Sequence, residues 1–433
     1  MTRAMKDSGI EWIGEIPVDW RVIKLRQLGN FTSSGIDKLI NPEEPLVRII
    51  NYTDVYNNKD YVLKNKEYMV VSAPQDKVMQ HQVNIGDLIF TPSSETVEDI
   101  GVSALVIETL PNTAFSYHVL RYTFNNEVYL GFKKYLCNNF YVYSSFSSKA
   151  KGTIRKTLSR EDFKEQLVLL PPLPEQQKIA DFLDEKCSHI DSVLEKIRAS
   201  IDEYKQLKQS IITQAVTKGV RPNRPMKDSG IEWIGEIPLD WDIYKVKHCF
   251  TRKNSKAKQD DPVVLSLTRS GVKIRDISTN EGQLAESYYD YNPVQVGDLL
   301  LNPMDLYSGA NCSYSDVEGV ISPAYINLKN KEGMSNSKFY DYYFKVQYWM
   351  MVLFSFGKGV SFYNRWTLGQ ETLMNFPIVY PLLSEQQQIA DFLDNKCSEI
   401  DKLITKKEQL IAELETYKKS LIYEYVTGKK EVI

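Results

Sequence analysis

The sequence predicts a mixed α/β (α+β) protein in which two similar globular domains are separated by two long helices that form an antiparallel coiled coil. Two observations lead to this prediction. Two segments of the chain each occur twice, and a sustained three-four alternation of apolar residues follows each copy of the second segment. Two similar units in one chain usually pack about an approximate twofold axis, so we expect a pseudo-twofold internal repeat.

The repeat is long and well defined. MKDSGIEWIGEIPVDW at 5–20 and MKDSGIEWIGEIPLDW at 226–241 differ at one position, and PPLPEQQKIADFLDEKCSHID at 171–191 returns as PLLSEQQQIADFLDNKCSEID at 381–401. The offsets of 221 and 210 residues are far longer than a solenoid unit, so each repeat should be a whole domain followed by the same helix. The expected parts are 1–170 (constant segment and first variable block), 171–220 (first long helix), 221–380 (constant segment and second variable block) and 381–433 (second long helix).

The stretches between the repeated segments, roughly 21–165 and 242–375, share little sequence but read as mixed α/β. Short β-branched runs bounded by turn residues predict strands within 46–55, 83–92, 102–108 and 115–124. One helix is expected over 127–146, and its counterpart in the second block over 337–354. GDLIFTP at 86–92 matches GDLLLNP at 297–303.

A helix from about 175 to 218 and its copy after 384 are predicted to form the coiled coil. Pro174 is tolerated in a first turn, and Ser384 with Gln387 fits a capping box. Lys208 interrupts the first apolar seam, and Lys407 and Lys418 interrupt the second. Ordinary amphipathic helices, each packed on its own domain, are the alternative, although 44 residues would span about 65 Å. The expected seam comprises Ala180, Leu183, Cys187, Ile190, Leu194, Ile197, Ile201, Tyr204, Ile211 and Ala215, with Ala390, Leu393, Cys397, Ile400, Ile404, Ile411, Leu414, Leu421 and Tyr425.

Composition limits the class of protein. The 433 residues are 42% hydrophobic and 25% charged, with a formal net charge of −3, which is ordinary for a globular chain. No apolar run is long enough for a membrane span, the start lacks a signal-peptide pattern, and the five cysteines form no C-x-x-C pair. We expect a cytoplasmic protein with reduced thiols and no membrane contact. The variable blocks are only mildly basic, so charge gives weak support for nucleic-acid binding.

Catalytic signatures are missing from the sequence. It contains no N-P-P-[YF] or D-P-P-[YF] methyltransferase motif and no G-x-x-x-x-G-K-[ST] phosphate loop. Glu203–Tyr204–Lys205 reads as helix surface rather than as a nuclease element, and Cys187 and Cys397 read as buried thiols. The four histidines lack metal-ligand spacing. We therefore expect no catalytic residue, metal site or cofactor in this chain.

Two loops carry residues suited to contact DNA, since basic and amide side chains bind phosphates and base edges. They are SSKAKGTIRK (147–156) and its counterpart FGKGVSFYNRW (356–366), and the alternative is that both are solvated surface. Short polar segments after the two GDL motifs are further candidates. The repeated W-I-G-E-I-P segments more readily anchor structure or a partner. The candidate DNA-binding residues are Lys149, Lys151, Arg155, Lys156, Lys358, Tyr363, Asn364, Arg365, Ser93, Ser94 and Asn302.

Two variable blocks, each introduced by W-I-G-E-I-P-x-x-W and closed by E-Q-Q-x-I-A-x-F-L-D, resemble the specificity subunits of type I restriction-modification systems. The resemblance covers essentially the whole chain. It implies that each block is a target recognition domain that reads one half of a split double-stranded DNA site, and that the helices set the gap. It also implies two methyltransferase (modification) subunits that use S-adenosylmethionine for adenine methylation. Two restriction-translocation subunits that use ATP and Mg would complete a complex for host defence.

Two rival interpretations stay open at this point. The chain could be the recognition half of a fused methyltransferase-nuclease, or a scaffold that no longer reads DNA. The missing methyltransferase motif argues against the first, and the two intact blocks with basic loops argue against the second. The target bases and the gap length do not follow from the sequence.

Overall fold

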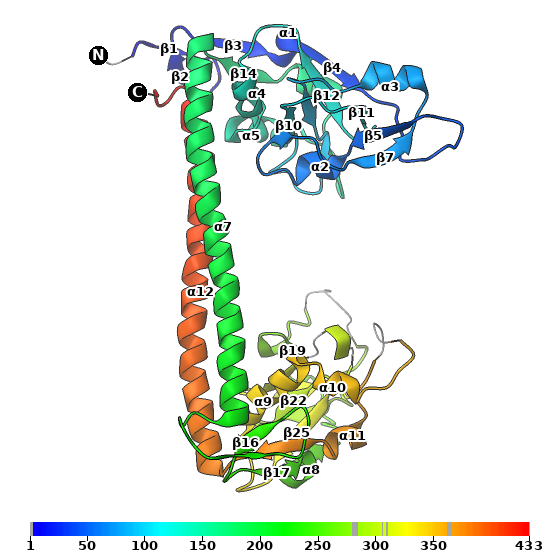
Figure 1. Ribbon diagram of the computed structural model, residues 1–433, viewed down its shortest axis with the longest axis vertical. Coiled ribbons are helices and arrows are strands. Elements are labelled where there is room, and N and C mark those ends of the chain that lie inside the picture. Colours follow the sequence, from blue (N-terminus) through cyan, green and yellow to red (C-terminus); the bar gives the residue numbers. More distant parts are fainter. Residues whose placement is uncertain (1–2, 279–284, 305, 309–310, 362–365, 433) are drawn as a thin grey trace. The chain divides into compact units, whose positions relative to one another are not determined.

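The computed structural model describes residues 3–278, 285–304, 306–308, 311–361 and 366–432. The chain divides into two compact units: unit 1 comprises 1–197 with 409–433, and unit 2 comprises 198–408. Both boundaries fall inside the long helices α7 (Leu173–Lys218) and α12 (Leu383–Val426) (Figure 1). Each unit therefore contains one half of each helix, and the predicted range of the first helix is confirmed.

Unit 1 is built on a five-stranded sheet with the order β4 (Gly29–Ser33), β12 (Leu120–Phe124), β8 (Leu88–Phe90), β10 (Ser103–Val106) and β6 (Val62–Leu63). Only the β10–β6 pair is parallel. A three-stranded sheet, β11 (Thr113–Phe115), β5 (Leu46–Ile50) and β7 (Met69–Ser72), carries helix α3 (Gln75–His81). The remaining elements are β1 (Met5–Asp7), β2 (Glu15–Pro17), β3 (Arg21–Lys24), α1 (Leu25–Leu28), α2 (Tyr52–Tyr56), β9 (Ser93–Ser94), α4 (Leu130–Cys137), α5 (Phe140–Lys149), β13 (Lys156–Thr157), α6 (Arg160–Lys164) and β14 (Leu167–Leu170).

Three predictions for this block are wrong in detail. The run 115–124 is not one strand, because β11 ends at Phe115 and β12 begins at Leu120. The strand expected over 46–55 ends at Ile50, because Asp54 accepts a 2.9 Å hydrogen bond from the backbone N–H of Asn51 and so caps helix α2. The single helix expected over 127–146 is two helices. Asn139 breaks it, since its side chain accepts from the N–H of Val142 and starts α5.

Unit 2 repeats the order of the main sheet in four strands: β18 (Phe250–Lys253), β25 (Ile326–Asn330), β22 (Leu299–Leu301) and β23 (Cys312–Tyr314). The matched GDL motifs thus lead into equivalent strands, β8 and β22. The helix expected over 337–354 is split into α9 (Ser337–Trp349) and α10 (Val352–Ser355) by Met351, whose φ of 58° is left-handed. The other elements are β15 (Met226–Asp228), β16 (Glu236–Pro238), β17 (Asp242–Lys245), α8 (Val246–Cys249), β19 (Leu265–Thr268), β20 (Gly271–Ile274), β21 (Asn292–Val294), η1 (Leu306–Ser308), β24 (Gly319–Ile321), α11 (Gln370–Met374) and β26 (Pro377–Tyr380).

The halves of α7 and α12 pair antiparallel within each unit. In unit 1, Lys418 donates to Asp191 at 2.6 Å and Phe182 contacts the ring of Tyr425. In unit 2, Lys208 donates to Asp401 at 2.6 Å. Residue numbers therefore increase along α7 in the direction in which they decrease along α12, so the two helices are antiparallel. The expected seam residues are buried or half-buried.

The seam lysines are not simple interruptions, which corrects the sequence interpretation. Lys208 and Lys418 each form an interhelical ion pair, and the Nζ atom of Lys407 lies 5.6 Å from the centre of the Tyr204 ring. A lysine can lay its alkyl stem along an apolar seam while its amine reaches a carboxylate at the edge. Lys208–Asp401 and Asp191–Lys418 are copies of one pair at the 210-residue offset, so the repeat extends to the helix register.

Each long helix begins against a copy of the sixteen-residue segment. The Nε1 of Trp20 donates to Glu175 at 2.9 Å, and that of Trp241 donates to Glu385 at 3.0 Å. A capping box at Ser384 is wrong, because α12 begins one residue earlier at Leu383. Among the described residues, no helix is both long and apolar enough to cross a membrane.

Candidate nucleic-acid interface

The basic loop of unit 1 is tied to the segment after strand β8. Strand β13 pairs antiparallel with β9, so that Lys156 lies opposite Ser94 and Thr157 opposite Ser93. A bridge between Lys151 and Thr157 closes the loop at its base. Two sets of candidates that were separate in the sequence therefore form one structure.

Arg155 is the most firmly held cation of this loop. Its Nε donates to Ser93 Oγ at 3.0 Å, and its guanidinium lies 5.0 Å from the centre of the Tyr52 ring. Tyr52 in turn stacks on Tyr56 at 5.1 Å, and the Tyr56 hydroxyl donates to Asp99. An arginine fixed in this way loses little side-chain freedom when it binds a planar acceptor such as a guanine edge.

The carboxylate below this stack is charged. Burial alone would raise the pKa of Asp99, but hydrogen bonds from Thr96, Tyr56 and Ser94 lower it. Burial raises the pKa of Tyr52. Asp99 therefore holds Tyr56 in place by accepting its hydrogen bond, and Tyr56 in turn stacks on Tyr52, the ring that Arg155 contacts. We call these two stacked tyrosines the platform; no direct bond joins Asp99 to Arg155 among the described contacts.

Further cations lie near the same loop. Burial and the nearby charges of Lys38 and Arg155 lower the pKa of His118, whose ring lies 3.8 Å from that of Tyr117. Arg160, just after the loop, donates to Ser33 Oγ. These cations suit an anionic ligand, and Asp37, Asp99 and Asp162 are carboxylates that lie near them.

The other predicted residues of unit 1 differ in exposure. Lys151 is exposed, whereas Lys149 is half-buried and its amine lies 3.5 Å from Gln166 Oε1. Lys156 donates to the carbonyl of Gly152 at 2.7 Å. Ser94 is fully buried and donates to Asp99 at 2.8 Å, so its role here is to support the platform.

Unit 2 builds an equivalent loop from different residues. Lys358 is exposed and bridges to Thr367, as Lys151 does to Thr157. The indole of Trp366 donates to the carbonyl of Phe354 at 2.8 Å and closes the base of the loop. Asn302 is half-buried, and its side chain accepts from the N–H of Met304. Tyr363, Asn364 and Arg365 lie outside the described residues.

The sequence interpretation missed Tyr52, Tyr56 and Asp99. Tyr52 and Tyr56 are four residues apart, and Asn51 stands three residues before Asp54; together these spacings are the signal for a capped helical turn. It was hidden because the preceding residues, 46–50, are strongly β-forming.

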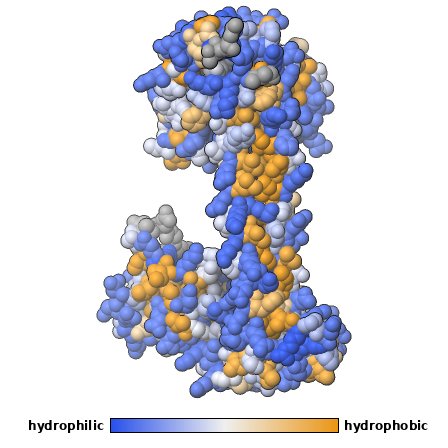
Figure 2. Space-filling model, turned by 90° about the vertical axis from the view of Figure 1, so that its left-hand side faces the viewer, coloured by the Kyte–Doolittle hydropathy of each residue, from blue (hydrophilic) through white to orange (hydrophobic). Residues whose placement is uncertain are grey.

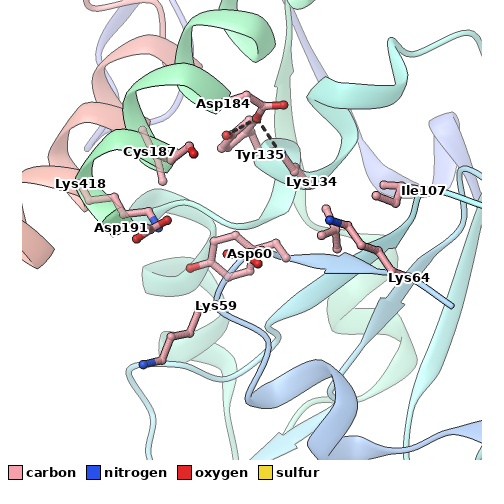
Figure 3. A pocket seen from close by; sticks show the side chains of 14 residues that line it. Lys59, Asp60, Lys64, Ile107, Lys134, Tyr135, Asp184, Cys187, Asp191 and Lys418 are labelled. Atoms are coloured by element: carbon pink, nitrogen blue, oxygen red, sulfur yellow. Dashed lines mark hydrogen bonds and ion pairs between the residues drawn. The ribbon is translucent and has the colours of Figure 1, made fainter. Parts of the chain in front are cut away.

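A polar pocket of about 450 Å³ lies in unit 1 where the loop 59–64 faces α7 and α12 (Figure 3). Its charged groups are largely engaged with each other. Asp184 accepts from Lys134 and from the Tyr135 hydroxyl, and Asp191 accepts from Lys418. Cys187 also lines it, and burial raises the pKa of that thiol. These contacts attach the globular part of the unit to the helices and indicate a structural role.

The cysteines and acidic residues offer no metal centre in the described part of the chain. All five cysteines are buried and free, which agrees with the reading of Cys187 and Cys397 as buried thiols. No group of three or more His, Cys, Asp or Glu side chains there could hold a metal ion.

Residues 17–203 and 243–416 match the type I restriction modification DNA specificity domain. The chain thus carries two copies of one DNA specificity domain, each with a loop of the kind described above. It belongs to the family of type I restriction-modification specificity subunits.

Curated relatives bear similar names. Over 420 residues the chain is 23% identical to the type I restriction enzyme MjaVIII specificity subunit of Methanocaldococcus jannaschii, which covers 91% of this chain and 90% of the relative. It is 27% identical over 242 residues to the MjaX specificity subunit of the same organism. That match covers 54% of this chain and spans about half, 53%, of the MjaX subunit.

Solved structures show a similar fold. A chain from a study of complex assembly and conformational transition of the type I R-M system aligns with a TM-score of 0.68 over 96% of this chain and 99% of its own length. The HsdS subunit from Thermoanaerobacter tengcongensis aligns with a TM-score of 0.51 over 96% and 98%. The identities are 15% and 16%, so these likenesses concern the fold alone.

Proposed function

We propose that each unit reads one half of a bipartite double-stranded DNA site through its basic loop, and that the chain itself performs no catalysis. The observation that carries the proposal is the held guanidinium of Arg155, which is fixed by Ser93 and the Tyr52 ring beside the exposed Lys151. Lys358 at the equivalent bridge supports the same role for unit 2.

Methylation mapping of DNA exposed to the assembled complex tests this proposal. Arg155→Ala should relax one base position in one half-site and cost about 1–3 kcal/mol there. The other half-site should be unchanged, because unit 2 supplies its own loop. Equal loss at every base of both half-sites, or no change, contradicts a base-reading role for Arg155.

We further propose that α12 offers a docking surface to modification subunits. These subunits would bind S-adenosylmethionine, and restriction-translocation subunits would bind ATP and Mg. Apolar side chains reach the surface along the long helices (Figure 2). On the part of α12 that belongs to unit 1, Leu410 and Tyr417 are 43% and 56% exposed and lie seven residues apart, which is the spacing of a second helix-packing stripe. Leu410→Glu should abolish co-purification with a modification subunit, whereas Lys406→Glu on the exposed polar face of the same helix should not.

The helices are proposed to set the gap between half-sites. Asp191 pairs with Lys418, so the residues around Lys196 face those around Glu413 in the same register. Four residues inserted after Lys196 and four before Glu413 add about 6 Å and about 40° of helix rotation, against 3.4 Å and about 34° per base pair. Mapping should show unchanged half-sites and a gap longer by one or two base pairs. Changed half-sites with an unchanged gap contradict a spacer.

A further inference from the structure

Two apolar side chains stand out within the two loops, Ile154 between the bridged residues Lys151 and Thr157 and Val360 between the bridged residues Lys358 and Thr367. Ile154 is 92% exposed and Val360 is 95% exposed, whereas the other exposed large hydrophobics among the described residues reach at most 69%. A single exposed aliphatic residue needs no explanation. Two that each lie between equivalent bridges, in blocks that share little sequence, need an explanation, because exposing an aliphatic side chain to water stabilises nothing within the chain.

The tip of the unit 1 loop is held rigidly. Gly152 has a φ of +117°, and a Cβ there would lie 2.1 Å from the carbonyl oxygen of Arg155, so the turn is too tight for another residue. Lys156 closes the turn from the other side by donating to the Gly152 carbonyl at 2.7 Å. Arg155 is fixed to Ser93 and the Tyr52 ring. Ile154 therefore projects from a preformed turn.

The surroundings of the tip indicate what covers it. Lys151, Arg155 and Lys156 flank Ile154, and Lys358 precedes Val360. An apolar protein partner would leave these cations facing its own apolar surface at a cost. Duplex DNA presents phosphates for the flanking cations and base faces for the aliphatic tip, as in proteins that insert apolar wedges between base steps.

We propose that Ile154 and Val360 are apolar wedges, one for each half-site, that enter the duplex and unstack a base step. This inference rests on the proposed DNA-reading function. It adds that binding distorts the DNA at two places, so that each unit selects sequences whose steps unstack readily as well as sequences whose edges it contacts.

The test uses the full chain and a duplex that carries the mapped site, with 2-aminopurine in place of each adenine on either strand of the two half-sites in turn. Wild-type protein should raise the fluorescence at one step in each half-site, because 2-aminopurine brightens when it loses its stacking neighbour. Ile154→Ala should remove the rise in one half-site only and weaken binding about tenfold. Its salt dependence should be unchanged, since no charge is lost. Val360→Ala should do the same in the other half-site.

Matched variants make the result decisive. Ile154→Met keeps an apolar tip and should retain the signal, and Ile85→Ala, at an isoleucine of unit 1 that is 52% exposed, should bind as wild type. Fluorescence that never rises with wild type, or that persists in Ile154→Ala, overturns the wedge while DNA reading stands. Ile154→Ala that binds DNA normally but no longer co-purifies with a modification subunit also overturns it. Wild-type protein that prefers the mapped duplex no more than a scrambled one overturns both proposals.

Discussion

The segment at 5–20 and its copy at 226–241 show how one sequence behaves in two settings. Trp12 is 59% exposed, whereas Trp233 is half-buried, with its ring 5.2 Å from that of Phe356 and 6.0 Å from that of Phe376. Unit 1 has Gln166 in place of Phe376. The carbonyl of Gln166 accepts from the N–H of the first residue of α1, and the carbonyl of Phe376 accepts from that of the first residue of α8. The variable block therefore decides what covers this tryptophan.

The two units share the contact that attaches each copy of the sixteen-residue segment to the start of α7 or α12. Arg3 and Trp20 bind Glu175 in unit 1, as Arg224 and Trp241 bind Glu385 in unit 2. The hydrogen bond to Glu175 raises the pKa of Arg3. Burial would lower the pKa of Arg224, but Glu385 and Asp240 raise it. A repeated segment can thus keep one fold while its exposed side changes.

Replacing Glu175 in unit 1 or Glu385 in unit 2 with alanine should give the largest summed loss of stability, and the two losses should differ. The Glu385 and Arg224 side chains are 4% and 10% exposed, against 20% and 22% for Glu175 and Arg3. Glu385→Ala removes the acceptor of the Trp241 N–H and leaves the Arg224 guanidinium with Asp240 alone, so it should cost about 2–3 kcal/mol. Glu175→Ala should cost roughly half as much, because water reaches its partners.

Hydrogen exchange at the start of each long helix measures this difference, since the two units need not unfold as one. Glu385→Gln, which still accepts the tryptophan N–H, is the control and should lose less protection than the alanine variant. Equal losses for Glu175→Ala and Glu385→Ala would show that burial does not set the strength of this contact.

The second largest summed loss of stability is expected for alanine substitutions of Trp12 and Trp233. Trp233→Ala removes a ring packed against two phenylalanines and should destabilise unit 2 by about 2–3 kcal/mol. Trp12→Ala should change the stability of unit 1 by less than about 0.5 kcal/mol, as exposed substitutions do. Fluorescence emission checks the premise, because loss of Trp12 should remove red-shifted emission and loss of Trp233 blue-shifted emission.

The sequence predicted the repeat, the long helices and the position of the basic loops, because these depend on identity and period alone. It could not predict the pairing of β9 with β13, which brings together residues more than sixty positions apart in the chain. Nor could it reveal that Tyr52 and Asp99 hold Arg155, or that the seam residues Lys208 and Lys418 find carboxylates on the other helix. Those contacts need three-dimensional proximity that no local pattern encodes.

The matched aspartates of the two GDL motifs should show a smaller contrast. Asp298 is 3% exposed and pairs with Lys253 at 2.5 Å, so Asp298→Asn leaves a nearly buried ammonium and should cost about 2 kcal/mol. Asp87 is 2% exposed and accepts from Thr123 and the N–H of Asn84, with no ion pair to a cation among the described contacts. Asp87→Asn should cost about 1 kcal/mol or less.

Asp87 also predicts a pH dependence. Burial raises its pKa, against the opposing effect of its hydrogen bonds with Asn84 and Thr123. The folded state then binds the proton more tightly than the unfolded state, so the contribution of Asp87 to stability falls as the pH rises from about 4 through the folded pKa. Urea unfolding across this range should show a weaker decline for Asp87→Asn. A steeper decline would mean that the carboxyl is stabilised in its charged form.

The smallest effect is expected at the lysines of the two loops. Lys151 and Lys358 are exposed at equivalent bridges, so each can meet a phosphate, whereas Lys149 lies against Gln166 and burial lowers its pKa. Lys151→Ala and Lys358→Ala should each flatten the slope of log affinity against log salt by about 0.9, with Lys149→Ala as the matched control that leaves it unchanged. Between 50 and 200 mM salt, one such contact changes the affinity about three- to fourfold, which titration of a labelled duplex resolves. If Lys149→Ala flattens the slope and Lys151→Ala does not, the face of the loop that meets DNA is the opposite one, and the equivalence drawn between Lys151 and Lys358 fails with it.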